Sequence, residues 1–132
     1  MIMGITTTVR LFAILGCVNA ALAVSLGAFG AHALKSRLST EMLEIYQTAV
    51  QYHFYHALGL FAVAFMAYLL PDAGVPKWAG WLMLGGIVLF SGSLYVLALT
   101  GTRWLGAITP IGGVALLAGW ALLIWKSWKT HL

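Results

Sequence analysis

Residues 78–102 read WAGWLMLGGIVLFSGSLYVLALTGT, an uncharged stretch of 25 residues between Lys77 and Arg103. A helix that crosses the hydrocarbon core of a bilayer needs about 20 consecutive apolar residues. Backbone groups find no water partners in that core, so a segment of this kind has to be helical. The period-two alternation of a membrane β-barrel strand is missing from it. The stretch therefore predicts a transmembrane helix.

Three further apolar runs accompany this stretch. Their charge-free or charge-poor parts cover residues 11–31, 54–71 and 104–125. Together the four runs predict an all-α membrane protein, a bundle of four transmembrane helices that span approximately residues 10–31, 53–71, 77–100 and 104–126. The connections are too short for a soluble domain, so residues 1–132 are expected to form a single transmembrane domain.

The composition also indicates a membrane protein. Hydrophobic residues make up 62% of the chain and charged residues only 8%, whereas about a quarter of the residues in a soluble domain are charged. The net charge of +4 comes from basic residues scattered at the ends of the runs. Because they form no basic patch, no nucleic-acid partner is predicted. The partner that the composition does predict is the lipid bilayer.

The N-terminal run is expected to stay on the chain. Residues 31–33 (Ala-His-Ala) resemble a signal-peptidase site, but the apolar run before them is longer than the apolar core of a signal peptide, which has roughly 7–15 residues. Residues 14–17 resemble a lipoprotein signal, but few apolar residues precede Cys17. As the single cysteine, Cys17 excludes an internal disulfide and is expected to pack between helices as a small residue.

Alternation of the four spans assigns the loops to two membrane faces. The N-terminus, the second loop and the C-terminus share one face, called side A, and the first and third loops share the other, called side B. Side A carries Arg10, Lys77, Lys126 and Lys129, and side B carries Lys35, Arg37 and Arg103. Since cytoplasmic loops are enriched in Lys and Arg, this small excess predicts cytoplasmic N- and C-termini. Five tryptophans lie towards side A, as an interfacial belt would place them: Trp78, Trp81, Trp120, Trp125 and Trp128.

The first loop contains the main polar segment. Ser39 is suited to cap a helix, and Glu41 follows near the positive end of the helix dipole. No Gly or Pro interrupts this helix before Gly59. An unbroken helix from Thr40 to Leu70 would be about 46 Å long, which exceeds the hydrocarbon core of about 30 Å. The sequence thus predicts an amphipathic extension before span two, whose first turns leave the membrane or bend onto its surface.

Most hydrogen-bonding side chains of the spans are expected towards side B, with Asn19 near mid-depth as the exception. One interpretation is a ligand-binding pocket at this end of the bundle, floored by His56, Ser91, Ser93 and Thr109. The competing interpretation of the serines is close packing, because helix interfaces in membranes favour small and hydroxyl residues. Small residues also recur every four positions in spans one and four, at Ala23, Gly27, Ala31, Ala115 and Gly119.

Three histidines raise the question of a metal or haem site. His53 and His56 are three positions apart on one helical face, and His32 ends span one at the same side. Three imidazoles could bind Zn, Cu or haem. A bare i, i+3 pair is also the pattern of histidines that only hydrogen-bond their neighbours, so no metal or cofactor is predicted. His56 is expected to point deepest and is the candidate for a functional proton donor.

The chain shows no sign of enzymatic machinery. A Ser-His-acid set, a phosphate loop and a dinucleotide fingerprint are all missing from the sequence. The three acidic residues fall in loops or at helix ends. No catalytic residue is therefore predicted, and the protein is expected not to be an enzyme.

Pro110 is the most suggestive backbone feature. It cannot donate a hydrogen bond to the carbonyl of Gly106, so span four is expected to kink there. The free carbonyl is expected to receive a hydroxyl from Ser91 or Ser93, and the Thr109 hydroxyl to bond back into its own helix. Proline interruptions also occur at transporter sites, although a kink in a packing helix is the commoner case.

Four separated motifs carry a family resemblance. They are GAFGAHALK at residues 27–35, HAL at 56–58, FSGSLY at 90–95 and LGAITPIGG at 105–113. With these motifs the chain resembles the YgdD/YwdK-like family of small bacterial inner-membrane proteins, a family of unknown function related to transmembrane protein 256 of animals. The resemblance implies a multi-pass protein of the bacterial plasma membrane. It implies no activity and no catalytic residue.

These observations lead to two functional hypotheses. The first is a non-enzymatic accessory or scaffold protein that self-associates or joins a larger membrane complex, because it combines small-residue interfaces with almost no exposed polypeptide. The alternative is a small transporter or ligand-binding membrane protein that uses the pocket at side B. A water-accessible cavity at side B would favour the alternative, and a dry, packed bundle would favour the scaffold.

Overall fold

A computed structural model describes residues 4–130, which are helical apart from short connections. It consists of four helical rods. The first rod is α1 (Thr7–Phe29) with a π-helical turn η1 (Gly30–Leu34), and the second is α2 (Thr40–Leu69). The third rod is α3 (Gly74–Ile87), joined by a π-helical turn η2 (Val88–Gly92) to α4 (Ser93–Thr100), and the fourth is a 3-10 turn η3 (Arg103–Ala107) followed by α5 (Thr109–Lys129). Each rod is long and apolar enough to cross a membrane. The predicted all-α fold with four spans is confirmed, and each rod begins before its predicted span.

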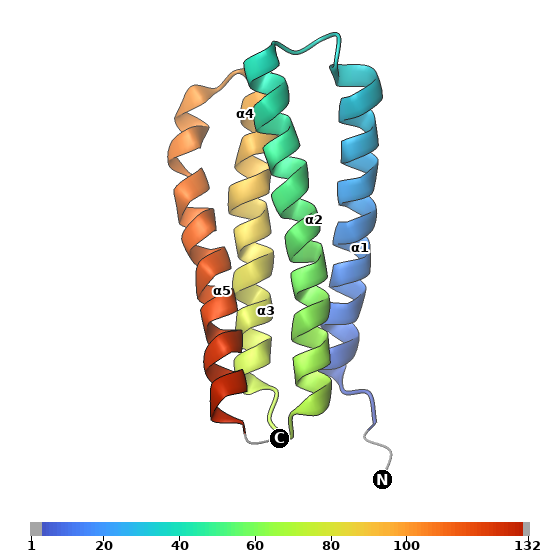
Figure 1. Cartoon of the computed structure of the whole chain (residues 1–132), viewed down its shortest axis with the longest axis vertical. Helices are drawn as coiled ribbons and strands as arrows, with labels where there is room; N and C mark the ends of the chain where they lie inside the picture. Colours follow the sequence, from blue (N-terminus) through green and yellow to red (C-terminus); the bar gives the residue numbers. More distant parts are fainter. Residues whose placement is uncertain (1–3, 131–132) are drawn as a thin grey trace.

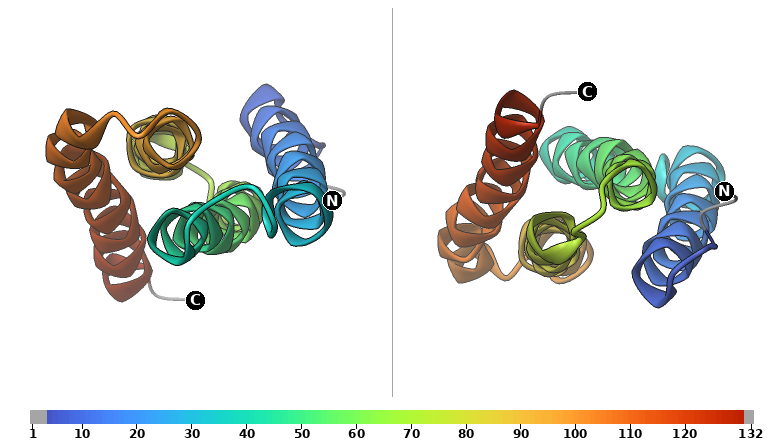
Figure 2. Two further views of the ribbon diagram at one scale, coloured as in Figure 1. Left: turned by 90° about the horizontal axis from the view of Figure 1, so that it is seen from above. Right: turned by 90° about the horizontal axis from the view of Figure 1, so that it is seen from below.

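The rods form a folded row, not a closed ring. They run antiparallel in chain order, and the start of α1, the α2–α3 connection and the end of α5 lie at one end, side A (Figure 1). Seen along the bundle, α2 and the α3–α4 rod lie in the middle, with α1 and α5 at opposite edges (Figure 2). Accordingly α1 packs chiefly on α2, and α5 chiefly on α3 and η2. One core cluster joins the rods around Phe12, Leu60 and Met83, which are fully buried.

Glycines allow close contact between α5 and the third span. A Cβ on Gly112 would fall against the backbone of Phe90 in η2. A Cβ on Gly119 would lie 2.8 Å from Cγ of Met83. Helix interfaces in membranes use small residues in this way to bring backbones together. The close-packing interpretation of Gly119 is therefore confirmed, and Gly112 belongs to the same interface.

The predicted extension before span two is confirmed as part of one helix. The hydroxyl of Ser39 accepts a hydrogen bond of 3.2 Å from the backbone N–H of Met42, and this cap starts α2. In the same first turn, both carboxylate oxygens of Glu41 accept hydrogen bonds from the guanidinium of Arg103, at 2.9 and 3.1 Å. The start of α2 is thereby linked to the start of the fourth span. The helix then continues without interruption to Leu69.

Pro110 does not lie inside a continuous α-helix, as the predicted kink in span four assumed. Pro110 lies in the first turn of α5, and the residues before it form the 3-10 turn η3. Proline suits the first turn of a helix because its missing N–H needs no partner there. The serines do not reach Gly106 either, since Ser91 donates to the carbonyl of Ala49 and Ser93 to that of Phe90. The Thr109 hydroxyl lies 3.4 Å from the carbonyl of Leu105 in its own rod, but the hydroxyl of Ser93 is its closer partner, at 2.7 Å.

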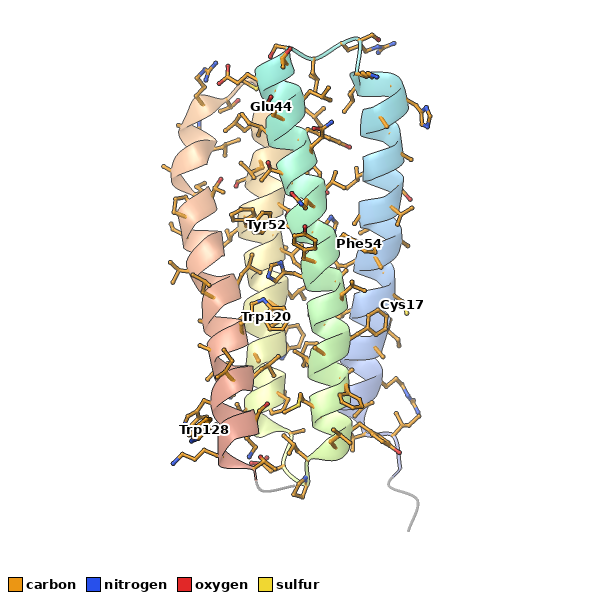
Figure 3. The ribbon with its side chains drawn as sticks, viewed as in Figure 1. Cys17, Glu44, Tyr52, Phe54, Trp120 and Trp128 are labelled. Atoms are coloured by element: carbon orange, nitrogen blue, oxygen red, sulfur yellow. The ribbon has the colours of Figure 1, made fainter. Side chains whose placement is uncertain are left out.

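The expected interhelical role of Cys17 is also wrong. Its side chain is exposed on the outer surface of α1, as Figure 3 shows. The positions of α1 that pack against the neighbouring rods are Phe12, Gly16, Asn19 and Ala23. Cys17 immediately follows Gly16, and the helical rotation of one residue carries it off this face.

Candidate functional site

A chain of three polar side chains, two buried and one half-buried, crosses the middle of the row. His53 of α2 lies 3.0 Å through Nε2 from Oδ1 of Asn19 in α1, and 3.0 Å through Nδ1 from the phenol oxygen of Tyr95 in α4. Both Asn19 and His53 are buried. The chain therefore joins three of the four spans through one imidazole.

The hydrogen bonds of Asn19 determine which nitrogen of His53 carries the proton. The amide nitrogen of Asn19 donates to the carbonyl of Leu15 at 2.8 Å, so its oxygen is the atom that faces His53. That oxygen can only accept, so Nε2 of His53 is protonated and donates to it. Nδ1 then accepts from the hydroxyl of Tyr95. All three groups are satisfied in a neutral state, which is the arrangement that a low-dielectric interior favours.

The contact with Asn19 corrects the expected depth of the histidines. Asn19 lies near the middle of the uncharged run from Leu11 to Leu34, so His53 lies near mid-depth as well. The expectation that His53 and His56 open span two at side B is therefore wrong. The first turns of α2 occupy the side-B end, and the polar layer lies in the centre of the bundle.

His56 forms a second, separate polar contact one turn further along α2. Its Nδ1 lies 2.8 Å from the carbonyl oxygen of Tyr52, an acceptor, so Nδ1 carries the proton. Its Nε2 then accepts a hydrogen bond of 3.0 Å from the indole N–H of Trp120 in α5. His56 is the opposite tautomer from His53, and both of its nitrogens are used within the chain. As a result it has no free proton to donate, against the expectation from the sequence.

The four candidate residues of the predicted pocket do not line one common pocket. Ser91 is buried and bonds the backbone of α2 at Ala49, at 2.8 Å. The hydroxyls of Ser93 and Thr109 lie 2.7 Å apart and join α4 to α5. His56 alone lines the main groove. The packing interpretation of the hydroxyl residues fits these contacts, because each one connects two helices.

The main groove lies between α2 and α5 and has a volume of about 480 Å³. Aromatic and apolar side chains line it almost entirely: Tyr52, Phe90, Pro110, Gly113, Val114, Leu116, Leu117 and Trp120, with His56 among them. Figure 3 places Tyr52 and Trp120 along the middle part of the rods, away from Glu44 and Trp128 at the two ends. The groove thus opens sideways from the bundle at the depth of the polar layer, and it can accept an apolar group.

The three histidines of the possible metal site are separated. His32 is exposed in η1 at the side-B end, whereas His53 and His56 are buried at mid-depth. Within residues 4–130, no group of three His, Cys, Asp or Glu side chains is arranged to hold a metal ion. These side chains offer a metal no ready-made set of ligands.

Sequence reasoning missed Tyr52 and Trp120 as parts of the site. Trp120 was expected in the tryptophan belt at side A, but its indole reaches His56. The signal that pointed the right way was Asn19, a lone amide in the middle of an uncharged span. Such a group needs a partner from another helix, and the nearest span in the chain supplies His53.

Comparisons with known proteins agree with this architecture. A family model described as "Protein of unknown function (DUF423)" matches residues 26–113. The UPF0382 membrane protein YwdK of Bacillus subtilis is 56% identical over 115 residues, which cover 87% of this chain and 94% of the relative. A UPF0382 membrane protein of Staphylococcus saprophyticus is 48% identical over 120 residues, with coverages of 91% and 98%. No solved structure matches the chain. The chain therefore belongs to the DUF423 family, whose YwdK-like relatives are named as membrane proteins.

Proposed function

We propose that this protein is a non-enzymatic scaffold or accessory protein of the bacterial plasma membrane, which acts by packing against membrane-embedded polypeptide. The observation that carries the proposal is the division between its interior and its surface. Among the residues that the structure describes, every buried side-chain nitrogen and oxygen has a hydrogen-bond partner within the chain. By contrast, many large apolar side chains are exposed along all four rods.

This division argues for an interaction role over solute transport. A transport pathway needs polar groups that are free to bind a solute or water at the membrane centre. Here the central groups Asn19, His53 and Tyr95 bind one another. The ring nitrogens of His56 in the groove are likewise hydrogen-bonded within the chain. The groove therefore holds no activated acid, base or nucleophile, which supports a non-enzymatic protein.

A second candidate function is the binding of a molecule dissolved in the membrane. The groove between α2 and α5 favours it, because about 480 Å³ lies within the range of small-molecule sites and the lining is aromatic. The occupant would be an apolar chain or ring that enters from the lipid. This candidate replaces the polar pocket expected at side B.

The orientation remains a prediction from charge. We place the N- and C-termini in the cytoplasm, because side A carries four basic residues and side B three. A reporter fused to the C-terminus tests this placement. Activity of a cytoplasmic reporter is expected, and activity of a reporter that works only outside the cytoplasm would reverse it.

The scaffold proposal is tested by affinity purification from cross-linked membranes in mild detergent. The protein should retain a polypeptide, either another copy or a different membrane protein, at a fixed stoichiometry. An unrelated four-span protein of similar abundance serves as the control. Recovery of a lone monomer, together with protein-dependent flux of a small solute into vesicles, would refute the scaffold and favour transport.

A further inference from the structure

The outer face of α2 carries a line of exposed side chains, most of them polar. Its residues recur every three or four positions and are exposed: Glu44, Gln47, Gln51, Tyr55 and, at its end, Leu58. The buried positions Tyr46, Ala49, His53 and Leu60 lie on the opposite side of the helix. This line, called the α2 outer face, is therefore not buried against the other rods of the chain, although it runs beside α1.

Gln51 and Tyr55 form a hydrogen-bonded pair in the middle of this face. The amide nitrogen of Gln51 donates to the phenol oxygen of Tyr55 at 2.6 Å. The amide oxygen of Gln51 and the hydroxyl proton of Tyr55 have no partner within residues 4–130. If the amide is turned over, Tyr55 donates to Gln51, and the free groups are then the amide NH2 of Gln51, a donor, and the phenol oxygen of Tyr55, an acceptor. The pair is self-complementary in either orientation.

The depth of the pair makes these free groups costly. His53, which lies near mid-depth through its bond to Asn19, is between Gln51 and Tyr55 in the same helix. Tyr55 is 49% exposed to the surroundings of the bundle, which at this depth are lipid. An unpaired donor or acceptor in hydrocarbon is unfavourable, and polar side chains on membrane helices form hydrogen bonds to a neighbouring helix.

We propose that a second copy of this chain covers the α2 outer face. Copies inserted in the same direction are related by a two-fold axis along the membrane normal, so equal heights meet. The polar groups of the Gln51 and Tyr55 side chains lie at the same depth along the membrane normal, because they are hydrogen-bonded to each other. Tyr55 of each copy then donates to the amide oxygen of Gln51 in the other, and two reciprocal bonds close the contact, as in an isologous interface. This inference rests on the proposed scaffold function and names its partner.

The surface beside the pair is shaped for such an approach. A shallow groove of about 370 Å³ between α1 and α2 is bordered by Gln51 and Tyr55. Its α1 side consists of small residues and one valine: Ala23, Val24, Gly27 and Ala28. Small residues let a second helix come close enough for short side chains to hydrogen-bond. The groove thus provides room next to the polar pair.

Charge fixes where the two α2 helices cross. Glu44 lies on the same face towards side B and has no ion pair among the described residues. Two Glu44 carboxylates at equal height repel each other, so the helices must diverge towards side B and approach most closely near Gln51 and Tyr55.

Energy transfer between labelled copies in lipid vesicles tests the proposal. The label is attached at Ser36→Cys in a Cys17→Ser chain, and the protein-to-lipid ratio is varied in phosphatidylethanolamine–phosphatidylglycerol vesicles. The labelled chain that keeps Gln51 and Tyr55 is expected to pair at low protein density. The combined change Gln51→Leu and Tyr55→Phe should raise the density needed for half-pairing roughly tenfold. Tyr68→Phe removes a phenol hydroxyl from an exposed position elsewhere on α2 and should leave pairing unchanged.

A mixing experiment makes the test specific to reciprocal bonds. Neither Gln51→Leu nor Tyr55→Phe alone can form the bond with its own kind. A mixed pair regains one bond, from Tyr55 of the first variant to Gln51 of the second, so donor-labelled and acceptor-labelled variants should pair better together than each with itself. Glu44→Gln should strengthen pairing, because it removes the repulsion.

Three results would overturn the inference: a monomeric wild type, equal pairing of wild type and the double variant, or no preference for mixed pairs. Circular dichroism of each variant controls for folding, which these exposed positions should not disturb. A monomeric chain that still retains a different membrane protein in the affinity purification would refute the second copy and leave the scaffold function standing.

Discussion

The indole nitrogen of Trp120 donates a hydrogen bond of 3.0 Å to Nε2 of His56, and this bond connects α5 with α2 across the main groove. The two rings also lie against each other, with centroids 5.9 Å apart. Since α2 and α5 otherwise meet little, the edge rod α5 is tied to the centre of the row through this pair and through its packing on α3.

Trp120→Phe is expected to lower the free energy of unfolding by about 1–3 kcal/mol, because the buried acceptor of His56 loses its donor. Unfolding in detergent, followed by circular dichroism, measures the change. Trp128→Phe is the matched control, since Trp128 is 84% exposed at the end of α5. Equal stability of both variants would show that the indole bond contributes nothing.

Asn19 and His53 should be coupled. Asn19→Leu leaves the protonated nitrogen of His53 without an acceptor, and His53→Leu leaves the oxygen of Asn19 without a donor, so each change is expected to destabilise the protein. The double variant should cost less than the sum of the two, by a coupling of about 1 kcal/mol. Additive losses in the unfolding free energies would contradict the bond.

Gly112→Ala is expected to destabilise the bundle by about 1–3 kcal/mol, because the new Cβ meets the backbone of Phe90 and cannot be relieved by a rotamer change. Gly85→Ala is the control, since nothing lies within 4 Å of its added Cβ. Thermal unfolding distinguishes the two. A Gly112→Ala protein as stable as the control would mean that α5 can shift away from η2 without loss.

Ser39→Ala should weaken the start of α2. The cap to Met42 is lost, and helix caps of this kind contribute about 0.5–2 kcal/mol. Hydrogen exchange of the first turn is the direct measurement, and faster exchange is expected there with no change near His53. Ser36→Ala, in the connection before α2, is the control.

Much of the fold follows from the positions of the charges. Lys77 and Arg103 bound the third span because charged groups are costly in lipid, and Ser39 marks the start of α2 because its hydroxyl can cap a helix. Both inferences are local. Each needs only the residue itself and a few neighbours, which is why the four spans and the long second helix could be predicted.

The site could not be predicted because it depends on the axial offset between neighbouring helices. His53 was placed at side B by counting from the loop, whereas Asn19 was placed at mid-depth by counting from the other end of its own span. Their hydrogen bond shows that α2 begins well before the membrane centre. The offset between antiparallel rods is set by packing, such as the fit of Gly30 against Tyr46, and no spacing within a single span reveals it.

The π-helical turn η2 has a consequence for how the length of this chain can vary. A π-helical turn holds one more residue than the α-helix it interrupts. In an uninterrupted helix each added residue would rotate everything after it by about 100°, and Tyr95 and Ser93 would face away from His53 and Thr109. The turn absorbs that rotation. A relative can therefore lose one residue within residues 88–92 and keep the direction in which the side chains of α4 point. The uninterrupted helix α2 offers no such tolerance.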